Sequence, residues 1–325
     1  MEYYRLKLIW DTNITGIFLI FVSVLLQVWL LFCDDNSQTW LIMESLRRAA
    51  QSTWENIWIG MFAENEFLIK TVGTVAVGLV CFLLANFIFL LIDLTGYPSW
   101  IYKYKIQEDK NFPVEKRRAL DVFKTALFNL VVINLFFMVM SYPLLNWYGT
   151  FRCTGPLPSF GELVVHFTVF RILEECGNYY GHRILHMPQF YKYHKKHHEW
   201  TAPIGMVAVY CGPIEHFFGN ILPVSAGPFI MKSHLFVAWL WELLVLTSVT
   251  IEHSGYHIPF LFSPEGHDFH HKTFTSWYGT MAFLDVLHGT DKPFSSSVQG
   301  RRQFVSCSLT PVKESVPGEI CNKHL

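Results

Sequence analysis

Charged side chains are scarce in this 325-residue chain: Asp, Glu, Lys and Arg make up 16% of it, against about 25% in soluble domains. Hydrophobic residues make up 51%, and the mean hydropathy is +0.27. Lysines and arginines number 25 against 26 acidic residues, so the chain lacks the basic excess typical of nucleic-acid binding. This composition indicates an integral membrane protein with no nucleic-acid partner.

A cysteine-pair signature and a metalloprotease signature are also absent. The seven cysteines are odd in number and scattered, and none forms a C-x-x-C pair, which argues against a disulfide scaffold or a cysteine zinc ribbon. H-E-x-x-H is missing as well, so a zincin protease would lack its general base. The chain is instead rich in histidine, with fifteen in all and twelve between His182 and His271. We expect the functional site there.

Six apolar stretches are candidate membrane spans. A helix rises 1.5 Å per residue, so about 20 residues cross a hydrocarbon core of ~30 Å. The stretches begin or lie at residues 14–32, 71–94, 126–145, 160 onward, 214–230 and 235–251. Basic residues precede the first stretch, but Cys33-Asp34-Asp35 offers no cleavage site, so a retained anchor is expected rather than a signal peptide. Prolines interrupt the fifth stretch, which makes it a candidate re-entrant or interfacial segment.

The loop charges predict an orientation. Seven basic residues lie in the 97–125 loop, and the positive-inside rule therefore places this loop in the cytosol. Two further crossings then bring the histidine motifs to the same side. We predict an all-α, multi-span integral membrane protein with a cytosol-facing, histidine-rich di-metal domain. Residues 1–96 form an N-terminal transmembrane anchor region, 97–291 the histidine-motif domain, and 292–325 a polar, loosely ordered tail.

The histidines fall into four clusters. Residues 182–186 and 253–257 have the form H-x-x-x-H, and 194–198 and 267–271 have the form H-x-x-H-H. On a helix, residues three and four apart share a face, so the first histidine of H-x-x-H-H shares a face with the last two, which diverge from each other. One short helix can thus serve two adjacent metal ions. The candidate ligands are His182, His186, His194, His197, His198, His253, His257, His267, His270 and His271.

The number of ligands helps to choose the metal. Ten imidazoles shared by two ions is about five each, more than the four ligands of a structural zinc. Imidazole suits iron, copper, nickel and zinc, and five nitrogens on an octahedral ion leave one position open, as dioxygen activation by non-haem iron requires. A single H-x-x-x-H arises easily by chance. Four clusters in 90 residues, two of them with paired histidines, favour a metal site over a structural or solvated role.

Other ionisable residues near the motifs have two interpretations. Glu174, Glu175 and Asp268 are candidates to accept N–H bonds from the ligand rings and so fix their tautomers; the alternative is that they are ordinary interfacial carboxylates. His166 lies within an apolar stretch, where an ionisable residue is a functional candidate, but a hydrogen-bonded structural role is favoured. His216 is a candidate accessory ligand or pocket wall.

These motifs make the chain resemble the integral-membrane fatty acid hydroxylase superfamily, which includes C-4 methylsterol oxidases, sterol desaturases and fatty acid 2-hydroxylases. The resemblance covers about residues 97–291. H-K-K-H-H-E at 194–199 and H-S-G-Y at 253–256 point to the methylsterol oxidase branch. His257 departs from it, because methylsterol oxidases often have Asp at this position and fatty acid hydroxylases often have His.

The resemblance implies an enzyme of the endoplasmic reticulum membrane that uses two iron ions, dioxygen, and electrons from NAD(P)H passed through cytochrome b5 and its reductase. It carries the ligand role to the ten histidines, and zinc can replace iron on overexpression. We expect a monooxygenase that acts on a sterol 4-methyl group. The alternatives are a fatty acyl or sphingolipid hydroxylase, a desaturase, or, in a different class, a non-catalytic metal- or lipid-binding regulator.

Overall fold

The computed structural model describes residues 38–318. The predicted first span at 14–32 lies outside the described residues. Within them every regular element is helical, and strand-like pairing is limited to two isolated bridges. The prediction of an all-α fold is therefore confirmed for the described part of the chain.

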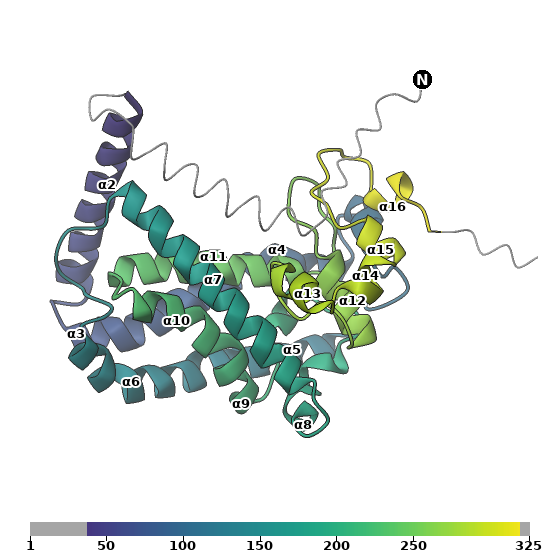
Figure 1. Ribbon diagram of the computed structural model, residues 1–325, viewed down its shortest axis with the longest axis horizontal. Coiled ribbons are helices and arrows are strands. Elements are labelled where there is room, and N and C mark those ends of the chain that lie inside the picture. The colour runs from purple at the N-terminus through teal and green to yellow at the C-terminus, as the bar shows by residue number, and fades with distance from the viewer. Residues whose placement is uncertain (1–37, 319–325) are drawn as a thin grey trace, which may run out of the picture.

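The longer helices form the body of the molecule, and most of the short ones lie in the C-terminal segment (Figure 1). The longer helices are α2 (Gln38–Asn56), α4 (Thr74–Thr95), α5 (Lys116–Leu127), α6 (Asn134–Tyr148), α7 (Phe160–Leu185), α10 (Leu222–Ile230), α11 (Leu235–His253) and α12 (Glu265–Thr273). The short ones are α3 (Glu66–Leu68), α8 (Tyr191–His194), α9 (Pro213–Glu215), α13 (Phe283–His288), α14 (Lys292–Ser295), α15 (Val298–Arg301) and α16 (Val312–Ser315). Single π-helical turns join α3 to α4, α5 to α6 and α9 to α10.

Three described helical segments are long and apolar enough to cross a membrane: Glu66–Thr95, Lys116–Tyr148 and Leu235–His253. They contain three of the predicted spans. Their apolar side chains are widely exposed, as Leu84 at 70% and Ile88 at 66% illustrate, which is the expected pattern for a surface solvated by lipid.

Two other predicted spans are not among these candidates. Helix α7 is 26 residues long, but it carries several charged groups, including Arg171 and the adjacent pair Glu174 and Glu175. The 214–230 stretch is divided between α9, a π-helical turn and α10, with Pro228 inside α10. Charge in one case and broken helical geometry in the other explain why neither forms a simple apolar span.

The core that positions the histidines is built around the segment that follows the second motif. Residues 205–209 form a 3-10 turn that contacts α4, α5 and α11. Val207 is fully buried there beside Phe82 of α4 and Val122 of α5. Asn86 of α4 donates to Thr250 of α11 at 3.0 Å. The segment after His198 is thus held between the two apolar helices that lie next to the site.

The C-terminal segment does not behave as predicted from its polar composition. Helix α15 packs against α12, and Phe294 of α14 is 1% exposed in a cluster with Trp277. Gln299 donates to Asp268 at 3.0 Å, and Gln303 accepts from the Gly266 backbone at 3.0 Å. The prediction of a loosely ordered tail is wrong for residues 292–316, because these glutamines and aromatic contacts fix them against α12.

The contact between α7 and α10 gives a test of the fold. Gly227 lies against α7 so closely that a Cβ atom there would be 2.5 Å from Cα of Phe170. We expect Gly227→Ala to destabilise the protein by about 1–3 kcal/mol, as overpacking does. Gly161, in the first turn of α7, is the control, because an added Cβ meets nothing within 4 Å. Thermal unfolding in detergent should show a lower midpoint for Gly227→Ala only; equal midpoints would contradict this packing.

Candidate metal centre

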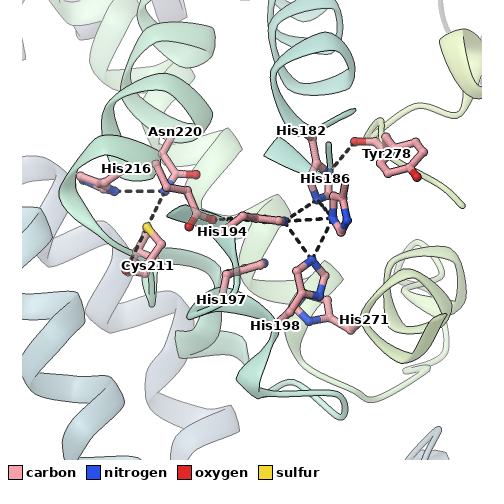
Figure 2. A network of polar contacts seen from close by, with 12 residues as sticks. His182, His186, His194, His197, His198, Cys211, His216, Asn220, His271 and Tyr278 are labelled. Atoms are coloured by element: carbon pink, nitrogen blue, oxygen red, sulfur yellow. Dashed lines mark hydrogen bonds and ion pairs between the residues drawn. The ribbon is translucent and has the colours of Figure 1, made fainter. Parts of the chain in front are cut away.

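The structure gathers nine of the ten predicted histidines into two separate groups; Figure 2 shows four members of the first, His182, His186, His194 and His198. Within each group, one ring nitrogen from every member lies within 4.8 Å of the others. The first group is His182, His186, His194, His198 and His270, and the second is His197, His253, His267 and His271. Five nitrogens and four nitrogens thus face two neighbouring points.

The H-x-x-H-H motifs divide between the groups as helix periodicity predicts. His194 and His198, four residues apart, join the first group, whereas His197 joins the second. In α12, His267 and His271 join the second group and His270 the first. Residues four apart lie on one face and the residue between them points elsewhere, so each motif contributes to both groups.

The separations between the ring nitrogens match those around one ion. In the first group, Nε2 of His198 lies 2.8 Å from Nε2 of His194 and 3.0 Å from that of His186. In the second, Nε2 of His267 lies 2.8 Å from that of His253 and 3.1 Å from that of His271. Nitrogens bound at ~2.0–2.1 Å to one ion and set at right angles are about 3 Å apart.

Backbone carbonyls fix the tautomer of several of the grouped histidines. Nδ1 of His182 lies 2.9 Å from the Tyr278 carbonyl, and Nδ1 of His270 lies 2.7 Å from the Ser276 carbonyl. Nδ1 of His271 likewise lies 3.0 Å from the carbonyl of residue 200. A carbonyl only accepts hydrogen bonds, so Nδ1 carries the proton in each ring. Nε2 is then an unprotonated lone pair aimed at the centre of its group.

This donor set fits two metal ions. Unprotonated Nε2 atoms about 3 Å apart repel one another unless a cation lies between them, and burial removes the water that would otherwise solvate them. Five or four imidazoles suit iron, copper, nickel or zinc. The residues present therefore fit metal ions at both groups, with five candidate nitrogens at the first and four at the second.

Burial keeps these histidines neutral. Removal from water, followed by repulsion from His182, lowers the pKa of His186 to about 2. Desolvation also holds the pKa values of His267, His270 and His271 well below the ordinary value of 6.5. Neutral imidazole is the form that binds metal, so these rings do not need to lose a proton to bind metal at neutral pH.

The lowered pKa values predict acid sensitivity. Below pH 6.5 the histidines of the unfolded chain bind protons, whereas the same rings in the folded protein stay neutral. The free energy of unfolding therefore falls as pH falls, by about 1.4 kcal/mol per pH unit for each such histidine. Burial also raises the pKa values of several carboxyls, such as Glu174, Glu215 and Asp268, the last to about 7, which acts in the opposite direction, but the histidines with lowered pKa values outnumber them. The unfolding midpoint should fall as the pH is lowered from about 6.5 to 5. A midpoint that is flat or rises over that range would contradict the neutral assignment.

His257 is the predicted ligand that joins neither group. Its Nε2 lies 3.0 Å from the Phe304 carbonyl, and its Nδ1 lies 3.5 Å from both Ser263 and Glu265. Helix α11 ends at His253, and Gly255 follows with φ +74°. The helical spacing assumed for H-x-x-x-H therefore does not extend to His257, which contacts the C-terminal segment instead.

The three predicted carboxylate partners contact other groups. Glu174 pairs with Arg171 and accepts from Asn178 at 3.0 Å. Glu175 accepts from the backbone N–H groups of residues 280 and 281 at 2.9 and 2.8 Å. Asp268 accepts from the side-chain amides of residues 107 and 299, each at 3.0 Å. Among the described residues, none of the three contacts a histidine ring; Glu175 instead holds the loop whose Tyr278 carbonyl accepts from His182.

The carboxylate that does contact a grouped histidine is Glu215, which the sequence did not single out. Its Oε1 lies 2.6 Å from Nδ1 of His194, and it is 5% exposed. The carboxylate–imidazole pair orients the ring and raises its basicity toward a metal on Nε2. The sequence did contain one signal for this role: Pro213-Ile214-Glu215 places a carboxylate at the N-terminal end of an apolar stretch.

His166 and His216 lie in hydrogen-bonded networks. Nδ1 of His166 lies 3.0 Å from Oγ of Ser233. Nε2 of His216 lies 2.9 Å from Oδ1 of Asn134, and its Nδ1 accepts from Asn220 at 3.0 Å, as Figure 2 shows for the second contact. Neither belongs to the two groups, and both rings make hydrogen bonds to polar side chains of other residues.

Comparison with known proteins places this chain in a family. The family model described as fatty acid hydroxylase matches residues 167–290. Fatty acid hydroxylase domain-containing protein 2 of Homo sapiens is 41% identical over 286 residues, which is 87% of this chain and 85% of that protein. The chain belongs to the fatty acid hydroxylase family. All nine grouped histidines and Glu215 lie inside the matched range, which itself falls inside the predicted 97–291 domain.

Other family members carry different names. Fatty acid hydroxylase ahd1 of Mycosarcoma maydis is 38% identical over 74% of this chain and 62% of that protein. Methylsterol monooxygenase 2-2 of Arabidopsis thaliana is 31% identical over 71% of this chain and 88% of that protein. No solved structure matches the chain.

Proposed function

We propose that this fatty acid hydroxylase family member is a non-haem di-iron monooxygenase of lipids, with one iron at each histidine group. The observation that supports this most strongly is the convergence of unprotonated Nε2 atoms at two adjacent points. Iron supplies the reduction of dioxygen and the insertion of one oxygen atom into an unactivated C–H bond, with the second oxygen leaving as water. Two electrons and two protons balance that reaction.

The protein's own residues position and shield this chemistry. Backbone carbonyls and Glu215 hold the ligand rings, so little reorganisation is needed when the metal changes charge. Most of the grouped histidines are buried, and burial excludes the water that would compete with a lipid C–H bond. The apolar helices α4 and α11, which hold the core beside the site, give a hydrophobic substrate access from the bilayer.

A sterol 4-methyl group is the proposed target. The support is the pair of sequence motifs H-S-G-Y and H-K-K-H-H-E, together with a relative that is named methylsterol monooxygenase. A fatty acyl or sphingolipid chain is the second candidate, favoured by His257 and by the relative named fatty acid hydroxylase. Desaturation of either lipid requires the same oxidant and removes two hydrogens instead of adding oxygen.

The electron source and location follow from the same proposal. Reducing equivalents come from NAD(P)H through cytochrome b5 and its reductase. The site faces the cytosol at the endoplasmic reticulum membrane, since the basic residues of the 97–125 loop favour the cytosolic side. Exposed cations between the ligands, Arg183, Lys195 and Lys272, suit an acidic electron donor.

The substrate test is a sterol and sphingolipid mass profile of cells lacking the protein, rescued with the wild type or His271→Ala. We expect 4-methylsterols to accumulate and only the wild type to clear them. Flat sterols with a fall in hydroxylated sphingolipids would move the substrate to the second candidate. Equal rescue by His271→Ala would overturn the oxygenase proposal in favour of a non-catalytic binding role.

A further inference from the structure

Aromatic rings form a continuous series from the first histidine group to the protein surface. The Tyr278 ring centroid lies 5.7 Å from that of His182, 5.3 Å from His186 and 5.4 Å from His270. The ring of Tyr278 thus contacts three of the five proposed ligands of one ion. Its backbone carbonyl also accepts from His182, so the residue is fixed at the edge of the group.

The series continues through α7. The Tyr179 ring lies 6.3 Å from Tyr278 and is fully buried. It lies 5.2 Å from Tyr180, edge to face, and 5.2 Å from His288, stacked at 12°. Tyr180 is 45% exposed. Three tyrosines in successive contact therefore join the metal centre to a ring at the surface.

Each phenol on α7 has a defined place for its proton. The Tyr180 hydroxyl lies 3.0 Å from Nε2 of His288, within the range for proton transfer to an imidazole nitrogen. Tyr179 accepts from Arg183 at 3.0 Å and lies 3.2 Å from the hydroxyl of Thr290. The guanidinium disfavours positive charge on the buried Tyr179 ring, whereas the imidazole stabilises oxidation of Tyr180 by taking its proton. An oxidising equivalent is therefore more stable at the surface than midway.

We propose that Tyr278, Tyr179 and Tyr180 conduct oxidising equivalents out of the metal centre when oxygen is reduced without a bound lipid, and so protect the ligands. This inference rests on the oxygenase function proposed above. A centre that oxidises unactivated C–H bonds also oxidises its own imidazoles if no substrate is present. Phenols give up an electron more readily than imidazoles, so the three tyrosines are oxidised in preference to the histidines of the centre.

The transfer balances in electrons and protons. For each oxidising equivalent, Tyr180 loses one electron, which passes through Tyr179 and Tyr278 to the centre, and loses its phenol proton to Nε2 of His288. A small thiol in solution then returns one hydrogen atom to the Tyr180 oxygen and becomes a thiyl radical. His288 releases its proton to water. The net reaction is oxidation of one thiol by one electron at the surface instead of oxidation of a ligand inside.

The experiment exposes the reduced, iron-loaded protein to dioxygen without lipid, in the presence of a nitroso spin trap, and maps the trapped tyrosine by mass spectrometry. Phenylalanine replacements preserve ring packing but remove the readily oxidised phenol. We expect an adduct on Tyr180 in the wild type, its loss in Tyr179→Phe and in Tyr278→Phe although Tyr180 is intact, and no change in Tyr97→Phe. Tyr97 is the control because it is 74% exposed and outside the series.

A second readout is the number of oxygen-reducing cycles before the protein inactivates, which should fall several-fold in Tyr180→Phe while the initial rate with saturating lipid is unchanged. An adduct on Tyr180 that persists in Tyr179→Phe would be ordinary surface oxidation and would overturn the inference. A wild type that converts lipid but forms no adduct on Tyr180 also overturns it, and leaves the oxygenase function standing. A wild type that does neither overturns both.

Discussion

Replacing His198 by alanine is expected to remove at least one of two metal ions per chain and to lower lipid oxidation by more than about 100-fold. Its Nε2 lies within 3.2 Å of those of His186, His194 and His270, so it touches most of the first group. Loss of a ligand's outer partner alone costs 10–100-fold, and loss of the ligand itself costs more. Metal content per chain, measured by mass spectrometry on protein that elutes as wild type in detergent, gives the result.

His257→Ala is the matched control for that variant. It removes a buried histidine from the same domain, one that the sequence pattern also predicts as a ligand, but its ring contacts the Phe304 carbonyl and lies outside both groups. We expect it to retain two ions. The opposite outcome, with two ions in His198→Ala and a loss in His257→Ala, would contradict the division of the ligands described here.

Glu215→Gln is expected to weaken metal binding at the first group by about 10–100-fold. The glutamine fills the same space and its amide oxygen can still accept from Nδ1 of His194, but the negative charge that supports a cation on Nε2 is gone. Burial raises the pKa of the Glu215 carboxyl, and a cation on His194 opposes that effect by favouring the ionised form. Titration with a competing chelator measures the affinity.

The control for Glu215→Gln is Asp121→Asn. The Asp121 carboxylate accepts a hydrogen bond from Tyr210 at 2.7 Å and belongs to neither histidine group. The metal affinity of this variant should equal that of the wild type. If Glu215→Gln also bound metal as tightly as the wild type, the His194–Glu215 contact would have no role in holding the metal.

Local pattern was sufficient to predict how most of the histidines divide between the two groups. The spacing of His194, His197 and His198 fixes which rings share a face, and the structure divides them accordingly. That inference depends only on helix periodicity, which is a property of neighbouring residues. It succeeded wherever the chain was helical or nearly so, and failed at His257, where Gly255 ends the helical path.

The remaining features depend on contacts between distant segments. Glu215 contacts His194, which is 21 residues away in the sequence, and Gln299 contacts Asp268, which is 31 residues away. Neither pair can be predicted from local residue spacing. Glu175 is close to the ligands in sequence but holds the loop at residues 280 and 281 instead. The order of the C-terminal segment has the same origin, because its partners on α12 are not visible in its own polar composition.

The most direct measurement of the central claim is isotope incorporation from ¹⁸O₂ by the purified, iron-loaded protein given a membrane lipid extract and a reducing system. The account predicts one ¹⁸O atom in a lipid product, or a new lipid double bond with the label in water, formed by the wild type and by His257→Ala but not by His198→Ala. A wild type that binds two ions yet yields neither product, or a His198→Ala variant that yields as much as the wild type, would contradict it.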